Sequence, residues 1–122
     1  MLAFVFLLAL GAVSAQNQCI QLFSGNRGKD MILAKSQDVE LSGGRHFDVQ
    51  LTPPCDNTVL QVDVCDDVKP EGQIISVSEV TITRLSTRTA AITLHAKYYC
   101  PSSNPKNTYA DLPEPKVTIK DE

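Results

Sequence analysis

The sequence predicts an all-β fold, a small disulfide-braced antiparallel β-sandwich with about seven short strands. Three observations support this expectation. Apolar and polar residues alternate in runs of about five to ten, the runs are rich in Val, Ile and Thr, and clusters of Gly, Pro, Asn and Ser separate them. No run has a convincing helical period. A sandwich is favoured over a closed barrel.

Residues 1–15, MLAFVFLLALGAVSA, have the features of a signal peptide. They carry no charged side chain, and Val13 and Ala15 supply the small residues that signal peptidase needs before its cut. The apolar run is too short to span a bilayer. We therefore expect a cleaved signal peptide and a single mature domain at 16–122, secreted to the extracellular space.

The mature domain is mildly acidic. The formal net charge is −3 and basic residues form no run, which argues against binding to nucleic acid or to anionic membrane surfaces. No further segment is long and apolar enough for a membrane span. The oligomeric state is left open.

The first third of the chain predicts strands around one turn. Residues 19–23 alternate weakly, and the turn at 24–28 is rich in Gly and Asn, which tolerate positive φ. Apolar residues within 31–41 then indicate either one bent strand or two. A single helical turn near Met31 is the alternative.

The stretch Arg45–Asp67 predicts two strands around a Pro53-Pro54 corner. Proline donates nothing to a strand ladder and restricts the residue before it, so it ends the first strand. Apolar residues alternate on both sides of the corner: Phe47, Val49 and Leu51, then Leu60, Val62 and Val64. The simplest interpretation is an antiparallel hairpin with one face on the core.

The second half of the chain predicts further strands. A loop is expected at 68–73, and the alternation in 74–85 changes phase near Ser78-Glu79, which suggests a β-bulge or a strand that changes sheets. Residues 89–100 form the longest regular strand, and 117–119 a short closing one. The apolar face of the long strand holds Ile92, Leu94, Ala96, Tyr98 and Cys100, and its wet face holds Thr93, His95, Lys97 and Tyr99.

Four cysteines lie in the mature domain: Cys19, Cys55, Cys65 and Cys100. An even number in an exported chain without C-x-x-C pairs predicts two disulfides rather than a metal site. Ten residues, largely extended, place Cys55 and Cys65 about 30 Å apart, whereas a disulfide needs Cα atoms within about 7 Å. Excluding that pair leaves two connectivities. We favour Cys19–Cys55 with Cys65–Cys100 over Cys19–Cys65 with Cys55–Cys100.

The tripeptide Tyr98-Tyr99-Cys100 resembles the Y-x-C signature of immunoglobulin-like domains. The resemblance covers three residues, and the chain lacks the core tryptophan of those domains, since it contains no Trp at all. It is compatible with a sandwich that is immunoglobulin-like in architecture and assigns no family.

No residue pattern predicts catalysis. The two histidines, His46 and His95, fall mid-strand on faces expected to be wet, and no G-x-S-x-G elbow, dinucleotide fingerprint or P-loop occurs. We therefore expect no enzyme, no catalytic residue and no cofactor.

Four aspartates near the second strand of the predicted hairpin raise the question of calcium: Asp56, Asp63, Asp66 and Asp67. Calcium sites group several oxygens on one loop, and the D-x-D-x-D-G pattern is absent. A solvated acidic patch is the favoured interpretation, so no metal site is assigned.

The proline-rich segment 101–115 is the candidate contact surface, with Tyr109 and Leu112 as possible partner contacts. Loops on a β scaffold commonly carry recognition, and prolines lower the entropy lost on ordering. The alternative is a plain connection that covers a sheet edge.

These features together predict a secreted, non-enzymatic extracellular binding module. Its partner would be an extracellular protein, a glycan or a small ligand, with no nucleic acid among the targets. The alternatives are a structural component of an extracellular matrix or secretion and, less favoured, a small enzyme inhibitor.

Overall fold

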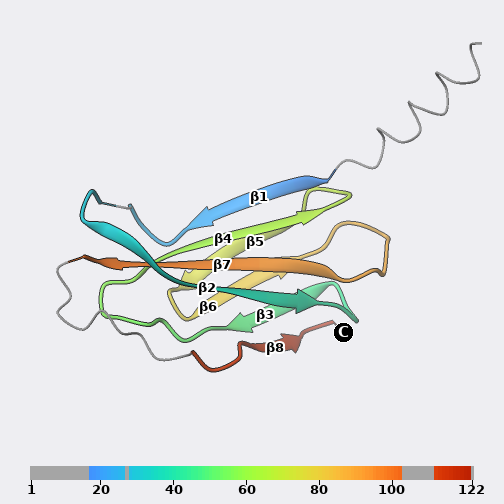
Figure 1. Ribbon diagram of the computed structural model, residues 1–122. Helices are drawn as coiled ribbons and strands as arrows, with labels where there is room; N and C mark the ends of the chain where they lie inside the picture. Colours follow the sequence, from blue (N-terminus) through green and yellow to red (C-terminus); the bar gives the residue numbers. More distant parts are fainter. Residues whose placement is uncertain (1–16, 27, 103–111, 122) are drawn as a thin grey trace, which may run out of the picture.

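The structure, a computed structural model, describes residues 17–26, 28–102 and 112–121 and forms two four-stranded antiparallel sheets packed as a sandwich (Figure 1). The first sheet has the order β1-β4-β7-β2 and the second the order β5-β6-β3-β8. The strands are β1 (Gln18–Phe23), β2 (Met31–Leu41), β3 (His46–Gln50), β4 (Val59–Asp66), β5 (Glu71–Ser76), β6 (Glu79–Thr83), β7 (Ile92–Pro101) and β8 (Lys116–Ile119). The predicted fold class is confirmed, with eight strands instead of about seven.

The core lies between the two sheets and follows from the alternation in the strands. Every second residue of a strand points to the same face, so the apolar set of each strand reaches the facing sheet. The fully buried side chains include Leu41, Phe47, Val49, Leu60, Val62, Val64, Val80, Ile82, Leu94, Ala96 and Tyr98. Burial raises the pKa of the Tyr98 hydroxyl to about 12. Its Oη donates a hydrogen bond to Gln37 Oε1 on β2 at 2.7 Å.

The predicted hairpin is wrong. β3 pairs with β6 and β8 in one sheet, whereas β4 pairs with β1 and β7 in the other. The corner at 51–58 therefore carries the chain from one sheet to the facing one, over the roughly 10 Å that separates packed sheets. Alternation identifies the buried face of a strand but not the strand beside it. A hairpin within one sheet and a crossing between two sheets therefore fit the same pattern.

The favoured disulfide pairing is also wrong. The bonds are Cys19–Cys65 and Cys55–Cys100, the second of the two connectivities, and the exclusion of Cys55–Cys65 is confirmed. β4 and β7 are antiparallel neighbours, so Cys65 and Cys100, each near the end of its strand, lie at opposite ends of the sandwich. Cys65 instead faces Cys19 directly across the β1–β4 ladder.

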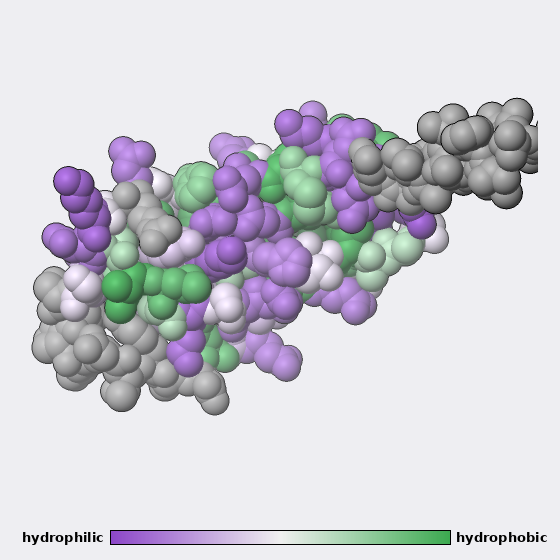
Figure 2. Space-filling view, turned by 45° about the horizontal axis from the view of Figure 1, so that its top comes forward, coloured by the Kyte–Doolittle hydropathy of each residue, from purple (hydrophilic) through white to green (hydrophobic). Residues whose placement is uncertain are grey.

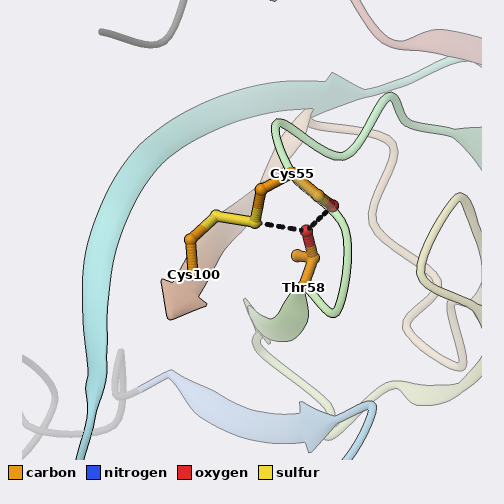
Figure 3. Close-up of a disulfide and its surroundings, with 3 residues drawn as sticks. All are labelled: Cys55, Thr58 and Cys100. Carbon is orange, nitrogen blue, oxygen red and sulfur yellow. Dashed lines mark hydrogen bonds between the residues drawn. A yellow bond between two sulfur atoms is a disulfide. The ribbon is translucent and has the colours of Figure 1, made fainter. Parts of the chain in front are cut away.

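The second bond fastens the corner to β7. Cys55 Sγ lies 3.1 Å from Thr58 Oγ1, and that hydroxyl donates to Cys55 O at 2.6 Å, so the corner is closed on itself beside the disulfide (Figure 3). Immunoglobulin-like domains join strands of two sheets with their cystine. Here Cys100 reaches a connection instead, so the Y-x-C resemblance does not extend to the disulfide.

Three further expectations are resolved. The phase change near Ser78 marks a tight β5–β6 hairpin, not a bulge within one strand, and β5 begins at Glu71, inside the expected loop. Residues 31–41 form one strand, bent by an irregularity between Leu33 and Lys35. The regular strand predicted from Thr89 begins at Ile92.

The wet face predicted for β7 holds only in part. Thr93 and His95 are exposed and Lys97 is half-buried, but Tyr99 is only 6% exposed. Tyr99 Oη donates to Gln61 Oε1 at 3.1 Å on the neighbouring strand. Gln61 Nε2 in turn donates to Asp63 Oδ2 at 2.9 Å, so a polar chain holds the tyrosine against the outer face of the sheet.

Because successive strands run in opposite directions, successive connections lie at alternate ends of the sandwich. The connections 42–45, 67–70 and 84–91 lie at the right-hand end of Figure 1, together with the last described residues 120–121. The corner at 51–58 lies at the opposite end. That end also presents exposed apolar side chains of Phe23, Ile32 and Leu33, and Figure 2 shows hydrophobic side chains on the surface at this left-hand end.

Candidate functional site

The end of the sandwich built from 42–45, 67–70, 84–91 and 120–121 gathers the arginines, and we call it the arginine end. Arg45 follows the β2–β3 turn, Arg84 follows β6, and Arg88 lies in the β6–β7 connection. These three are every arginine among residues 17–26, 28–102 and 112–121. In a chain with a net charge of −3, the arginines of the described residues are therefore concentrated at one end.

Arg84 forms a buried ion pair with the last residue of β4. Its Nε lies 2.8 Å from Asp66 Oδ2 and its Nη2 donates to Asp66 Oδ1 at 3.1 Å, a two-point contact. Nη1 donates to Ala90 O at 2.6 Å. Both side chains are almost wholly buried. The pair ties β4 of one sheet to the connection that leaves β6 of the other.

The pKa of Asp66 reflects two opposing causes. Burial raises the pKa, but the hydrogen bonds from Arg84 and from the Asp67 backbone, together with the positive charge of Arg84, hold it below its ordinary value. Asp67 N donates to Asp66 Oδ1 at 2.8 Å. The carboxylate is therefore ionised and also fixes the backbone at the start of the β4–β5 connection.

Ser86 organises the β6–β7 connection and is fully buried. Arg45 Nη1 donates to its carbonyl oxygen, and Arg88 N donates to its Oγ at 3.0 Å. The guanidinium of Arg45 thereby joins the β2–β3 and β6–β7 connections. Within the part of the chain that the structure describes, no side-chain hydrogen bond or ion pair is formed by the guanidinium of Arg88.

Asp121 closes the arginine end from the C-terminal side. Its carboxylate accepts hydrogen bonds from Arg45 N at 2.9 Å and from His46 N at 2.8 Å. The His46 backbone bond is the largest cause that lowers the pKa of Asp121 below its ordinary value, and the bond from Arg45 adds to it. The segment after β8 is thus anchored to His46 at the start of β3 and to Arg45 just before it.

A hollow of ≈ 380 Å³ is lined by Arg84, Asp66 and Arg88. Its lining also includes Asp67, Ala91 and Ile92. Oδ1 of Asp67 is buried and has no hydrogen-bond partner among the described residues. The guanidinium of Arg88, which has no side-chain partner among the described residues, is thus the charged group with free donors beside this hollow.

A second hollow of ≈ 310 Å³ adjoins the first. Arg88 lines both, and Arg45, Thr89 and Asp121 complete the second together with Gly43 and Gly44. Arg88 therefore stands between two depressions and can reach a group bound in either.

Leu112, one of the two predicted contact residues, lines neither hollow. Leu112 is half-buried and packs against the core, which agrees with a connection that covers a sheet. Tyr109 lies outside the described residues. The disulfide cysteines occupy both ends: Cys65 lines the first hollow, whereas Cys55 and Cys100 lie at the far end.

The histidines and aspartates of the sequence analysis are spread over the molecule. His46 Nδ1 lies 3.2 Å from Thr83 Oγ1, and His95 Nδ1 lies 2.7 Å from Asp38 Oδ1, both on exposed surface. Asp56 is in the corner, at the opposite end from Asp66. Across 17–26, 28–102 and 112–121, no three His, Cys, Asp or Glu side chains are grouped so that they could hold a metal ion.

Sequence reasoning missed the arginine end, although a signal was available. Arg45, Arg84 and Arg88 each fall in a connection next to a strand end. In an antiparallel sandwich, alternate connections lie at the same end, so counting strands would have brought the three together. The number of strands depends on β5 and β6 being two separate strands. If they are interpreted as one interrupted strand, the predicted direction of every later strand is reversed.

Comparison with protein-family models, curated proteins and solved structures found no match for this chain. Among the residues that the structure describes, none forms a helix long and apolar enough to cross a membrane. The two disulfides indicate that the chain folds in an oxidising compartment.

Proposed function

We propose that this protein is a secreted, non-catalytic binding module that contacts an anionic group of an extracellular partner through the arginine end. The observation that carries the proposal is the concentration of Arg45, Arg84 and Arg88 around two adjoining hollows in a chain of net negative charge. The signal-peptide pattern of residues 1–15 and the two disulfides support secretion.

The different contacts of the three arginines support this function. Arg84 is committed to Asp66 and builds the wall of the site. Arg45 uses one nitrogen to hold the carbonyl of Ser86. Arg88 keeps its planar fork of donors, which matches the two oxygens of a carboxylate, sulfate or phosphate group. The connections that present these side chains sit on a rigid β scaffold, where recognition commonly resides.

Binding to anionic polymers tests the proposal. Mature protein (16–122) would be titrated with polyglutamate, dextran sulfate and an oligosaccharide containing glucuronic acid, with affinity measured by calorimetry. The variant Arg88→Gln removes the guanidinium donors and should weaken binding about tenfold or more. Hydrogen bonds to charged groups each contribute about 1.5–3 kcal/mol.

Lysines at the far end provide the matched control. Lys29→Gln and Lys116→Gln remove the same charge from residues away from the arginine end and should change affinity by less than about twofold. If none of the anionic polymers binds, or if the lysine variants weaken binding as much as Arg88→Gln, the proposed function is wrong.

A structural, self-assembling component is the second candidate, and one observation favours it. β1 is an edge strand whose sequence QCIQLF contains no charged residue, and Phe23 at its end is 50% exposed. Unprotected edges invite pairing with another chain. Sedimentation velocity of the mature protein over a wide concentration range tests for self-assembly. A reversible increase in size that Gln21→Lys abolishes favours assembly. A monomer at every concentration excludes it.

A further inference from the structure

We propose that two copies of this protein pair their β1 strands antiparallel and form a closed dimer with two-fold symmetry. β1 is the outermost strand of its sheet, with β4 on one side and no described strand on the other (Figure 1). The inference does not depend on anion binding at the arginine end. It rests on the same edge as the second candidate function and commits that edge to a pair that stops at two copies.

The backbone of β1 has hydrogen-bonding groups that point away from its own sheet. Opposite residues in an antiparallel ladder alternate between hydrogen-bonded pairs, with Cα atoms about 5.5 Å apart, and non-hydrogen-bonded pairs about 4.5 Å apart. The Cα atoms of Cys19 and Cys65 are 4.0 Å apart, so this pair is of the second kind. Ser24 N donates to Leu60 O at 2.9 Å, which places the hydrogen-bonded pairs at the even-numbered residues of β1. The N–H and C=O groups that face the open edge therefore belong to Cys19, Gln21 and Phe23.

β1 is the least protected of the four edge strands of the described sheets. β2 contains Lys35, Asp38 and Glu40, and its ladder shifts register. β5 begins with Glu71 and also shifts register, and β8 has only four residues and begins with Lys116. Charged residues, irregularities and short length all keep an edge from pairing with another chain. β1, with the sequence QCIQLF, has no charged residue, no proline and no register shift.

One register pairs all three outward-facing residues of β1 with those of a second copy. In this register Gln21 lies opposite Gln21 of the second copy, and Cys19 and Phe23 lie opposite each other on both sides of it. Each copy then makes the same contacts as the other, which is the condition for a closed pair. The three residue pairs form about six backbone hydrogen bonds, two for each pair.

The outer face of the paired sheet covers an exposed aromatic ring with an exposed disulfide. Phe23 is 50% exposed, and Cys19, bonded to Cys65, is exposed as well. The register brings the Phe23 ring of each copy beside Cys19 of the other, since both side chains lie on the same face of β1. Contacts between sulfur and an aromatic ring are favourable. The symmetry forms this contact twice.

The inner face and the centre of the pair are also self-complementary. Ile20 and Leu22 are half-buried and pack against the core, and each comes to lie opposite the other residue in the second copy. At the two-fold axis the Gln21 amide meets its own copy, and an amide has both donors and an acceptor. No charged residue of β1 meets a like charge. A second copy of this chain therefore fits the edge without repulsion.

The contact consists of one six-residue strand from each copy, so we expect weak and reversible association. Sedimentation velocity of the mature protein (16–122) from low micromolar to millimolar concentration should show conversion of monomer to dimer and no further increase in size. Arg88→Gln, the variant that tests anion binding, should leave this conversion unchanged.

Charge variants test the register. Because Gln21 opposes itself, Gln21→Lys and Gln21→Glu should each raise the dissociation constant of the dimer about tenfold or more. An equimolar mixture of the two variants should dimerise at least as well as the wild type, because Lys then meets Glu. Gln21 lies opposite Asp63 in the β1–β4 ladder, so thermal unfolding of each variant is measured first.

Gln18 provides the matched control for the charge variants. It lies on the same strand and also faces an aspartate, Asp66, across the β1–β4 ladder. In the proposed register it lies outside the three pairs, opposite neutral Ser24 of the second copy. Gln18→Lys and Gln18→Glu should therefore change the dissociation constant by less than about twofold, alone or mixed.

Phe23→Ala tests the contact with the disulfide. Loss of the ring from both copies should raise the dissociation constant about tenfold. Leu33→Ala is the control, because Leu33 is 52% exposed and lies on β2, at the opposite edge of the same sheet. This variant should change the dissociation constant by less than about twofold.

Amide hydrogen exchange locates the contact on β1. As the protein concentration rises, exchange should slow at Gln21 and Phe23, whose N–H groups face the open edge. Exchange at Ile20 and Leu22 should stay the same, because their N–H groups already donate to β4 in the monomer.

The outcomes separate this inference from the proposed functions. A monomer at every concentration overturns the dimer and leaves anion binding at the arginine end untouched. Growth beyond two copies overturns the closed pair and favours the structural component. A dimer that the mixture of Gln21→Lys and Gln21→Glu fails to restore, or that forms without protection of Gln21 and Phe23, overturns the pairing through β1.

Discussion

Asp66 and Arg84 show how much one residue contributes when its charge is buried. Removing one partner of a buried pair leaves the other charge without compensation, which costs about 3–5 kcal/mol. The Arg84 side chain is almost wholly excluded from water, and Ala90 O is the only other acceptor for its guanidinium among the described residues. Asp66→Asn should therefore lower the free energy of unfolding by about 3–5 kcal/mol, measured by urea denaturation at pH 7.

Asp63→Asn on the same strand is the control for this variant. Asp63 is half-buried and accepts a hydrogen bond from neutral Gln61 Nε2, so its loss should cost about 1 kcal/mol or less. If both variants have the same small effect, water reaches Arg84 and the pair is not the stabilising contact described above.

Glu79 and Asp48 form the second informative pair of residues, on the outer face of the other sheet. Asp48 is 6% exposed, its Oδ2 lies 3.1 Å from Lys120 Nζ, and its Oδ1 has no donor among the described residues. A hydrogen bond to Asp48, together with the repulsion between the two carboxylates, raises the pKa of Glu79. When protonated, Glu79 has a donor to offer to the Asp48 carboxylate, which is why protonation of Glu79 is favoured.

The sign of the pH effect follows from the direction of that pKa. A raised pKa in the folded state adds stability below the ordinary value of 4.5, and this addition is lost as the pH rises through the folded pKa. Glu79→Gln carries a permanent amide donor, so the variant should melt at a higher temperature than the wild type at pH 7. The difference should shrink near pH 4. An equal shift in melting temperature at both pH values would contradict the shared hydrogen bond.

At the residue scale, alternation predicted the buried set well and the polar exceptions poorly. Leu94, Ala96 and Tyr98 were identified from their phase alone, since a strand has only two faces. Tyr99 has the wrong phase and is buried all the same, because Gln61 on the neighbouring strand accepts its hydroxyl hydrogen. Such a contact depends on which strand lies beside it, and the sequence does not contain that information locally.

At the element scale, the fit of β1 against β5 depends on Gly72. A Cβ at this position would lie 2.7 Å from Ile82 Cδ1, 3.0 Å from Ile20 Cδ1 and 3.1 Å from Leu22 Cδ1. Three side chains would have to move at once, two of them from β1 at the edge of the facing sheet. Gly72→Ala should destabilise the fold by about 1–3 kcal/mol, measured by chemical denaturation.

A double variant tests whether this steric contact is the cause. Ile82→Val removes the Cδ1 atom closest to the added methyl group, so Gly72→Ala with Ile82→Val should cost less than the sum of the two single changes. Gly25→Ala is the control, because a Cβ there meets nothing within 4 Å. Additive costs in the double variant would place the origin of the effect in the backbone instead.

The elements themselves were largely predictable, and their partners were not. Strand positions follow from local alternation and from Pro and Gly boundaries, both of which lie within a few residues. Pairing is decided by contacts distant in sequence. The corner at 51–58 crosses between sheets although it has the residues of a turn, and Ser78 marks a hairpin although its phase change also fits a bulge.

At the scale of the whole molecule, the disulfide pairing depends on the directions and neighbours of the strands. Excluding Cys55–Cys65 required only the length of one extended strand. Choosing between the remaining pairings required knowing that β1 lies beside β4, so that Cys19 faces Cys65. The arginine end was hidden for the same reason, since Arg45 and Arg88 meet only when every strand direction is known.

Acid should loosen the molecule from its arginine end. Two carboxylates with lowered pKa values, Asp66 and Asp121, hold this end together, the first through Arg84 and the second through the amides of Arg45 and His46. A lowered folded pKa gives stability that is present above the ordinary value of 3.8 and is lost as the pH falls through the folded pKa. Glu79 acts in the opposite direction on acidification, so the remaining structure is not weakened uniformly.

Hydrogen exchange measured residue by residue at pH 6 and pH 3, corrected for intrinsic rates, tests this directly. We expect protection to fall first in the connections 42–45 and 84–91, while the centre of β4 and β7 keeps the protection of the global fold. Asp121→Asn removes the charge that holds Arg45 N and His46 N, so it should raise exchange in 42–45 already at pH 6 and leave the β5–β6 hairpin unchanged. Equal loss of protection throughout the sandwich would mean that acid acts on the fold as a whole, and the two carboxylates would then have no local role.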